Sequence, residues 1–313
     1  MRPVAILTDS SSDLSPKYQQ EYGIRLIKAH LKLPGNDDAE AFVTWEEGGT
    51  DRDLFYSDLK KRPEAYATSP PNVEEFSAAI EELVSSGFDV VAITISSGIS
   101  GSYGFLTTAA AAVCAAHPEA EIGCVDTLRF GPCIGLMAIW AAKLRDEGKG
   151  CREITAWLEE NKVRFRQSGW LDDLTFVAKK GRISHAKAFF GTLAGVKPIG
   201  EFDSNGLTSV LTKAPGAKAA LATMISYIEK TITDPADQII FIAQTCRYAQ
   251  ALEYKRLIEE RIKPRAVCIN DVHPYCGINI GPGLLAAYYL GKPISADLSE
   301  EKKIFEEIAA AKK

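Results

Sequence analysis

Serine and glycine residues are concentrated in an uncharged stretch, ISSGISGS at residues 95–102. An apolar β-branched segment precedes it and an alanine-rich segment follows, so the stretch is expected to join a strand to a helix. Its glycines let the backbone turn tightly and expose amides such as that of Gly98, and the hydroxyls of Ser97 and Ser100 add short donors beside a partially positive helix start. These groups suit one anionic oxygen. A serine-capped turn that satisfies only its own backbone fits the same residues.

Two further stretches offer uncharged polar groups. In ATSPPN, residues 67–72, Thr68 and Ser69 precede two prolines that keep the chain extended and both hydroxyls out of a helix. A rigid linker between helices is the alternative interpretation. In GINIGPG, Asn279 supplies a neutral donor and acceptor, with a turn or cap as its alternative role. Pro282 is expected at the first position of the following helix, whose amides would form a second start suited to an anion.

Signatures of common catalytic sites are missing from the sequence. It contains neither G-x-x-x-x-G-K-[ST] nor G-x-G-x-x-G, so a nucleotide site is not expected. G-x-S-x-G is also missing, and spacing ties no histidine to a serine. Asp9 and Asp13 are a candidate pair of carboxylates, although Asp in a serine-rich turn is more commonly a cap. The four histidines are isolated and the seven cysteines contain no C-x-x-C pair, so no metal, cofactor or disulfide framework is expected.

Composition limits the classes of function further. The 313 residues carry a net charge of −5 and no block rich in Lys and Arg, so nucleic acid binding is not expected. No apolar run reaches the roughly 18 residues that a membrane span needs. The first residues lack the features of a signal peptide, and the cysteines are scattered and odd in number. A reducing cytoplasm is therefore the expected location.

The order of elements predicts an α/β protein with two domains. In the first half, strands and helices alternate as in right-handed βαβ units, which predicts a Rossmann-like parallel sheet with TDSSSD, ATSPPN, ISSGISGS and VDT gathered at one edge. Residues 196–213 read instead as an antiparallel hairpin with a primed turn at Asn205 and Gly206. We expect an N-terminal parallel-sheet domain at residues 1–167 and a C-terminal α/β domain at residues 168–313, whose mixed sheet contains this hairpin.

Motifs spread over nearly the whole chain resemble, in their order, those of the DegV family of fatty-acid-binding proteins. They are TDSSSDLS at 8–15, ATSPP at 67–71, ISSGISGSY at 95–103, VDT at 125–127, DDLTFVAKKGRIS at 172–184, KPI at 197–199 and IGPGLLAAYYLG at 280–291. Each motif alone is weakly specific. The ordered set is much more specific than any of its members.

The resemblance implies a protein that is not an enzyme and that holds a long-chain fatty acid in an apolar tunnel between its two domains. It implies that the hydroxyls of Thr68 and Ser97 meet the carboxylate. The complete candidate site comprises Thr68, Ser69, Ser97, Gly98, Ser100 and Asn279. The resemblance also implies presentation of the carboxylate to a separate ATP-dependent fatty acid kinase. Uncharged donors suit a carboxylate at the mouth of an apolar cavity, because a buried Lys or Arg would carry a large desolvation cost.

The chain departs from the family pattern in two places. Asn279 stands where many members have His, and the stretch KAPGAK carries Pro215 and Ala217 where members commonly have Arg. These changes leave a ligand-free regulatory homologue as one alternative. Another alternative is an enzyme that acts on a small acid or phosphoester through Asp9, Asp13 or a loop serine.

Overall fold

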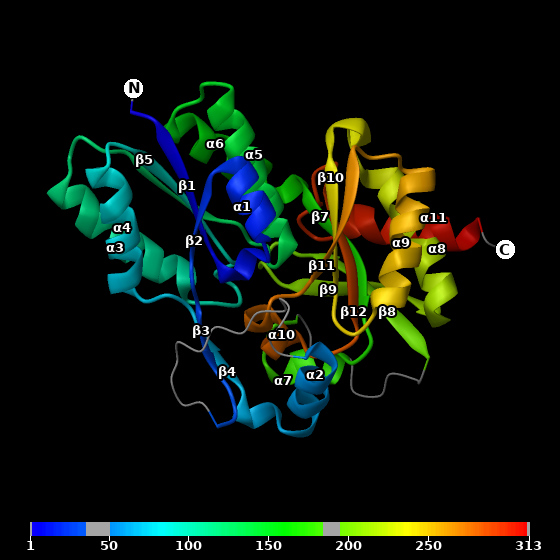
Figure 1. Ribbon diagram of the computed structural model, residues 1–313. Coiled ribbons are helices and arrows are strands. Elements are labelled where there is room, and N and C mark those ends of the chain that lie inside the picture. The colour runs from blue at the N-terminus through cyan, green and yellow to red at the C-terminus, as the bar shows by residue number, and fades with distance from the viewer. Residues whose placement is uncertain (1, 36–50, 184–194, 312–313) are drawn as a thin grey trace. The chain divides into compact units, whose positions relative to one another are not determined.

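The computed structural model describes residues 2–35, 51–183 and 195–311 (Figure 1). Strands and helices alternate along most of the chain, and the expected α/β class is confirmed. Within these ranges, no helix combines the length and the apolar character needed to cross a membrane.

The chain divides into two compact units. Unit 1 contains Met1–Val43 and Ala65–Lys162, and unit 2 contains Thr44–Glu64 and Val163–Lys313. The sequence placed the border between residues 167 and 168, which falls inside strand β7 (Phe165–Leu171). Because β7 pairs on both edges with strands of unit 2, the whole strand belongs there.

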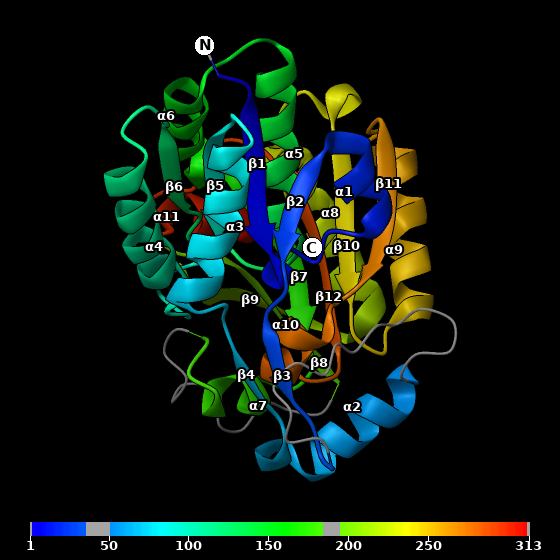
Figure 2. The same cartoon turned by 60° about the vertical axis from the view of Figure 1, so that its left-hand side comes forward.

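Unit 1 contains a four-stranded sheet in which every strand pair is parallel. Its strands are β1 (Val4–Asp9), β2 (Ile24–Ile27), β5 (Asp89–Thr94) and β6 (Ile122–Asp126), in the spatial order β2-β1-β5-β6 (Figure 2). Both central strands are buried along their whole length, as is usual where helices cover both faces of a parallel sheet. The expected parallel sheet is confirmed.

The helices of unit 1 follow the strand ends. They are α1 (Pro16–Tyr22), α3 (Val73–Ser85), α4 (Ser102–Ala116), α5 (Pro132–Asp146) and α6 (Cys151–Asn161), with a short 3-10 turn at Ser10–Ser12. Asn72 and Glu75 cap α3 reciprocally, through bonds of 2.9 and 2.8 Å between each side chain and the other's amide. α3 and α4 bury apolar residues such as Phe76 and Leu106 against β1 and β5.

A separate two-stranded ribbon carries the ATSPPN stretch. β3 (His30–Lys32) pairs antiparallel with β4 (Ala67–Ser69), and neither strand is part of the four-stranded sheet. ATSPPN was expected between two helices and near one edge of the parallel sheet, and its first three residues form the second strand of this ribbon. The two prolines that follow it keep β4 short, because proline cannot donate to a ladder.

Unit 2 contains a six-stranded mixed sheet in the order β11-β10-β12-β7-β8-β9. Besides β7, its strands are β8 (Val196–Phe202), β9 (Thr208–Pro215), β10 (Ile239–Gln244), β11 (Ala266–Asp271) and β12 (Leu284–Leu290). Only β10 and β11 pair in parallel. The expected mixed sheet and the β8–β9 hairpin are confirmed.

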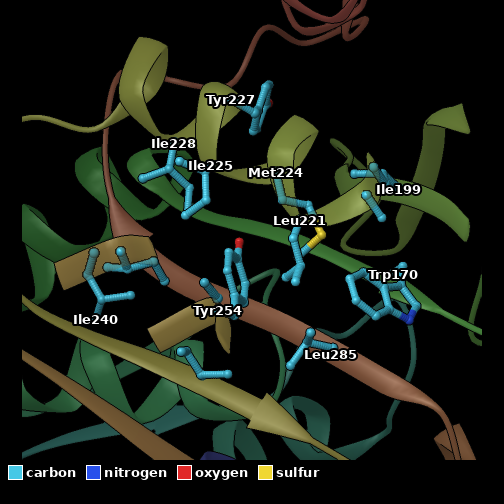
Figure 3. Close-up of a cluster of buried hydrophobic side chains, with 14 of the residues drawn as sticks. Trp170, Ile199, Leu221, Met224, Ile225, Tyr227, Ile228, Ile240, Tyr254 and Leu285 are labelled. Atoms are coloured by element: carbon cyan, nitrogen blue, oxygen red, sulfur yellow. The ribbon is translucent and has the colours of Figure 1, made fainter. Parts of the chain in front are cut away.

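The helices of unit 2 are α2 (Arg52–Lys61), α7 (Leu174–Lys179), α8 (Gly216–Thr231), α9 (Tyr248–Arg261), α10 (Pro274–Ile280) and α11 (Ser299–Ala310). Further 3-10 turns lie at Pro235–Asp237 and, across the borders between the units, at Pro63–Ala65 and Lys162–Arg164. α8, α9 and α11 enclose a large apolar core against the sheet. Residues of α8 such as Leu221, Met224 and Ile225 pack against Trp170 and Leu285 of the sheet (Figure 3). This packing holds the strand ends of unit 2 in place.

The prediction of a helix that begins at Pro282 is wrong. The residues after the Gly-Pro-Gly stretch form strand β12, and helix α10 ends before it. β12 lies between β10 and β7, and all but its first residue are buried. Its Leu and Ala residues favour a helix, but a central strand covered on both faces selects small and apolar residues whatever their propensity.

The turn of the β8–β9 hairpin also differs from the expectation. Both primed turns need positive φ at the first central residue, here Asn205, and type I′ needs it at Gly206 too. Of these two residues only Gly206 has positive φ, at 71°. The amide of Gly206 donates to the carbonyl of Asp203 at 3.1 Å, and Asp203 Oδ1 accepts from the amides of Asn205 and Leu207 at 2.9 and 3.1 Å. The Asp203 side chain therefore organises a longer loop.

Candidate functional site

The loop between β5 and α4 is tied to the end of the neighbouring strand β6. The amide of Ser97 donates to Asp126 Oδ1 at 3.1 Å, and the same oxygen accepts from the amide of Leu128 at 3.2 Å. The amide of Ser96 donates to the carbonyl of Arg129 at 2.9 Å. Asp126 is the last residue of β6. It holds Ser97 in place, a role that the sequence did not assign although VDT was recognised as a motif.

Most donors of this loop bind within the loop itself. The amide of Gly98 donates to Ser96 Oγ at 3.1 Å, and the amide of Ser102 donates to Ser100 Oγ at 3.2 Å. Two further amides donate to the carbonyl of Ser96. Ser97 differs, because it is exposed and its hydroxyl makes no hydrogen bond with any part of the chain that the structure describes. The loop thus offers a hydroxyl group more readily than a nest of amides.

Asp9 lies beneath the loop and is 1% exposed. It accepts hydrogen bonds from the amide of Ser11 at 2.7 Å, from the Ser11 hydroxyl, and from the Ser102 hydroxyl at 3.1 Å. Burial raises the pKa of Asp9, and the hydrogen bonds from Ser11 and Ser102 oppose that shift. A carboxylate so enclosed positions the start of α4 and cannot reach a substrate. Asp13 caps the same 3-10 turn in the left-handed region, with φ of 49°.

Hydrogen bonds bring together three of the four stretches expected at this edge, namely TDSSSD, ISSGISGS and VDT. Ser102 joins the loop after β5 to the end of β1 through Asp9, and Ser97 joins it to the end of β6 through Asp126. The amide of Ala29, which follows β2, donates to Ser10 Oγ at 3.1 Å. Because all four strands are parallel, their carboxyl ends meet at this edge.

Thr68 and Ser69 lie in the β3–β4 ribbon. Thr68 lies opposite Leu31 and is half-buried, whereas Ser69 lies opposite His30 and is exposed. His30 is itself held by Glu75, whose carboxylate lies 2.9 Å from His30 Nε2. The ribbon is thus tied to the first turn of α3, and the position of both hydroxyl-bearing residues is defined.

Asn279 belongs to unit 2 and lies inside helix α10. Its Nδ2 donates to the carbonyl of Tyr275 at 3.1 Å, so it is neither a turn nor a cap residue. The cap of α10 is His273, whose Nδ1 accepts from the amide of Tyr275 at 3.2 Å. Burial lowers the pKa of His273 to about 4, so this histidine is neutral at neutral pH. In the described parts of the sequence, no group of three His, Cys, Asp or Glu residues can hold a metal ion.

The fold and this loop define a class of protein with two α/β units and an uncharged, hydroxyl-bearing loop at the carboxyl edge of a parallel sheet. A model of the DegV family, described as an uncharacterised protein family, matches residues 3–292, and the chain belongs to this family. A DegV domain-containing protein of Clostridium perfringens is 30% identical, over 93% of this chain and 98% of its own length.

Solved structures share the fold over almost the full length. DegV, a fatty acid binding protein from Bacillus subtilis, is 26% identical with a TM-score of 0.74, covering 93% of this chain and 100% of that one. A fatty-acid-binding DegV family protein from Thermus thermophilus is 22% identical with a TM-score of 0.79, over the same shares of the two chains. At that identity the second likeness supports the fold alone.

Proposed function

We propose that this chain binds a long-chain fatty acid and that the hydroxyls of Thr68 and Ser97 hold its carboxylate. The observation that carries the proposal is the exposed hydroxyl of Ser97, fixed by Asp126 in a loop without charged side chains. Neutral donors hold a carboxylate without burying a cation, which would be costly beside an apolar chain. The fatty acid binding of the Bacillus subtilis relative supports the ligand class.

The other members of the candidate site have supporting roles in this proposal. Ser100 and Gly98 shape the turn that presents Ser97, since their own polar groups bind within the loop. Ser69 extends the polar surface next to Thr68. Asn279 offers a neutral donor, and its amide is oriented by its bond to the carbonyl of Tyr275. The chain itself is proposed to carry out no catalysis, in keeping with the burial of Asp9.

The protein purified without added lipid tests the ligand and the site together. Native mass spectrometry followed by solvent extraction is expected to show one fatty acid per chain, and its mass gives the chain length. The double variant Thr68→Ala/Ser97→Ala should lose the bound lipid, with at least about a tenfold weaker affinity, since two hydrogen bonds to a charged group are removed. The matched control is Ser85→Ala/Thr108→Ala, which removes two exposed hydroxyls from helices of the same unit. Equal retention in both variants would refute the site.

We further propose that the protein works in the cytoplasm and presents the acyl carboxylate to a separate ATP-dependent kinase. The family resemblance supports this step, which would yield an acyl phosphate. The test combines the lipid-loaded protein, the purified kinase and ATP, and traps acyl phosphate with hydroxylamine. Product is expected only when all three are present. Lipid binding without product would remove the kinase from the proposal and leave the fatty acid site intact.

A further inference from the structure

A group of charged side chains lies at the edge of the unit 2 sheet where β7 ends. Asp172 directly follows β7, Lys197 lies near the start of β8, and Arg247 follows β10. Lys197 Nζ contacts Asp172 Oδ1. Arg247 Nε donates to Asp172 Oδ2 at 2.8 Å, and Arg247 Nη2 contacts the same oxygen. Two cations thus share one carboxylate, and we call these three residues, together with Trp170, the Asp172 cluster.

The sheet places this cluster on one face. Side chains two residues apart on a strand point to the same face, so Asp172 shares the face of Trp170. Trp170 pairs with Ile199, and Lys197 lies two residues before Ile199 on the same face. Lys197 Nζ accordingly lies 5.7 Å from the centroid of the Trp170 ring.

The Gly-Pro-Gly stretch gives the cluster its space. The amide of Asp172 donates to the carbonyl of Gly283 at 3.1 Å, and Gly283 has φ of 102°. A Cβ at Gly283 would lie 2.7 Å from Cβ of Asp172 and 3.1 Å from its Oδ2. The motif therefore allows the carboxylate to lie directly over the backbone. This is a different role from the helix start that the sequence predicted.

The cluster has more N–H donors than its one carboxylate can accept. An ammonium group carries three N–H bonds, a guanidinium five and an indole one, and none of them accepts. Asp172 takes one N–H of Lys197 and two of Arg247, and the carbonyl of Cys246 takes one more at 2.6 Å. Trp170 is 2% exposed, and its Nε1 has no hydrogen-bond partner in the described ranges. Figure 3 shows this nitrogen on the side of the ring away from Leu221 and Met224.

The net charge of the cluster also favours an anionic ligand. Two cations and one carboxylate leave one positive charge, on side chains that are 18% exposed for Lys197, 19% for Asp172 and 32% for Arg247. The nearby carboxylate of Asp271 is held by its own partners, Arg52 and the side-chain Nε2 of Gln244. The cluster is therefore partly shielded from water and partly accessible to it.

We propose that Lys197, Arg247 and Trp170 form a binding site for a phosphate-class oxyanion. The anionic oxygens of such an ion accept hydrogen bonds, so they complement the spare N–H donors of Lys197, Arg247 and Trp170, and the guanidinium fork suits their geometry. Asp172 occupies part of this donor set and competes with the ligand. A carboxylate shares the acceptor chemistry, and the experiment separates the two. The site uses residues of unit 2 alone and does not depend on the fatty acid site.

Titration of the full chain with inorganic phosphate, followed by calorimetry and phosphorus NMR line width, tests this site. Asp172→Asn removes the competing charge and should bind phosphate about tenfold more tightly, equivalent to about 1.4 kcal/mol. Lys197→Met and Arg247→Met should each weaken binding about tenfold, and Trp170→Phe, which keeps the ring but removes the N–H, should weaken it a few-fold. Lys230→Met is the matched control, because this exposed lysine pairs with Glu307 elsewhere in unit 2.

Each outcome decides the matter. A purely structural clamp predicts that Asp172→Asn lowers the melting temperature without gaining phosphate affinity, and that result would overturn the proposal. Acetate binding as tightly as phosphate would overturn the phosphate class. If a methionine variant melts near the assay temperature, the comparison of Asp172→Asn with the parent protein decides alone. Fatty acid content measured on the same samples keeps this result separate from the fatty acid proposal.

Discussion

The carboxyl edge of the unit 1 sheet and the edge of the unit 2 sheet where β7 ends present different polar groups. In unit 1, the loop after β5 presents the hydroxyl of Ser97 and no charged side chain. In unit 2, the edge after β7 holds Lys197 and Arg247 on the carboxylate of Asp172. Cations are tolerated at the second edge because a carboxylate already balances part of their charge. The comparison teaches that strand ends fix where a site lies, while the local counter-charge fixes which polar groups can be used there.

The largest expected effect comes from removing the space under Asp172. Gly283→Ala adds a Cβ that overlaps the Asp172 side chain at a backbone φ of 102°, so the cluster must shift. We expect the free energy of unfolding to fall by about 2–4 kcal/mol. Chemical denaturation measures this loss.

The control for that variant isolates the overlap from the backbone strain. Gly216 also has positive φ, at 77°, but an added Cβ would meet no atom within 4 Å. Gly216→Ala should therefore cost only about 1–2 kcal/mol. Equal losses in the two variants would show that contact with Asp172 contributes nothing.

A smaller effect is expected at the loop that carries Ser97. Asp126→Ala removes the acceptor for the amides of Ser97 and Leu128, so we expect the loop to loosen and fatty acid affinity to fall about tenfold. Asp126→Asn keeps a carbonyl oxygen at the same position and should restore most of the affinity. Native mass spectrometry of retained lipid measures both. Failure of the Asn variant to recover would mean that the charge of Asp126 matters and not its geometry.

The loop of Ser97 can be predicted from the sequence more readily than the Asp172 cluster. Apolar strands followed by serine and glycine are local patterns, so the parallel sheet and the loop of Ser97 could be read directly. Strand β12 was mistaken for a helix because its leucines and alanines favour one, and only its central place in the sheet decides otherwise.

The Asp172 cluster cannot be predicted without the order of the strands in the sheet. Asp172, Lys197 and Arg247 are separated by 25 and 50 residues in the sequence. They meet because β10, β12, β7 and β8 are consecutive in the sheet. The sequence predicts the β8–β9 hairpin but not where it attaches. The bond from the Ser97 amide to Asp126 has a different cause. The sequence places both stretches at one edge, but strand order does not determine which side chain accepts from which amide.

The buried carboxylate of Asp9, beneath the loop of Ser97, should make the stability of the fold depend on pH. Burial raises the pKa of Asp9 above its ordinary value of 3.8. A carboxyl group with a higher pKa in the folded chain stabilises the fold fully below its unfolded pKa, and this contribution is lost as the pH rises through the folded pKa. Asp9→Asn cannot ionise, so its melting temperature relative to the parent should rise between pH 4 and pH 7. A constant difference across this range would show that Asp9 carries no such penalty.

The smallest effect is expected for a charge outside both edges, which tests whether charge alone accounts for the contrast. Arg25 forms an ion pair with Glu82 on the surface of unit 1 at 2.9 Å, and the two side chains are 55% and 60% exposed. Water already solvates both groups there, so Arg25→Ala should change the free energy of unfolding by no more than about 0.5 kcal/mol. Arg247→Ala should cost more by the same denaturation assay, because it leaves Asp172 partly shielded with a single cation. Similar losses of unfolding free energy in the two variants would mean that the Asp172 cluster behaves as ordinary surface. The difference between the two regions would then depend only on the exposed hydroxyl of Ser97.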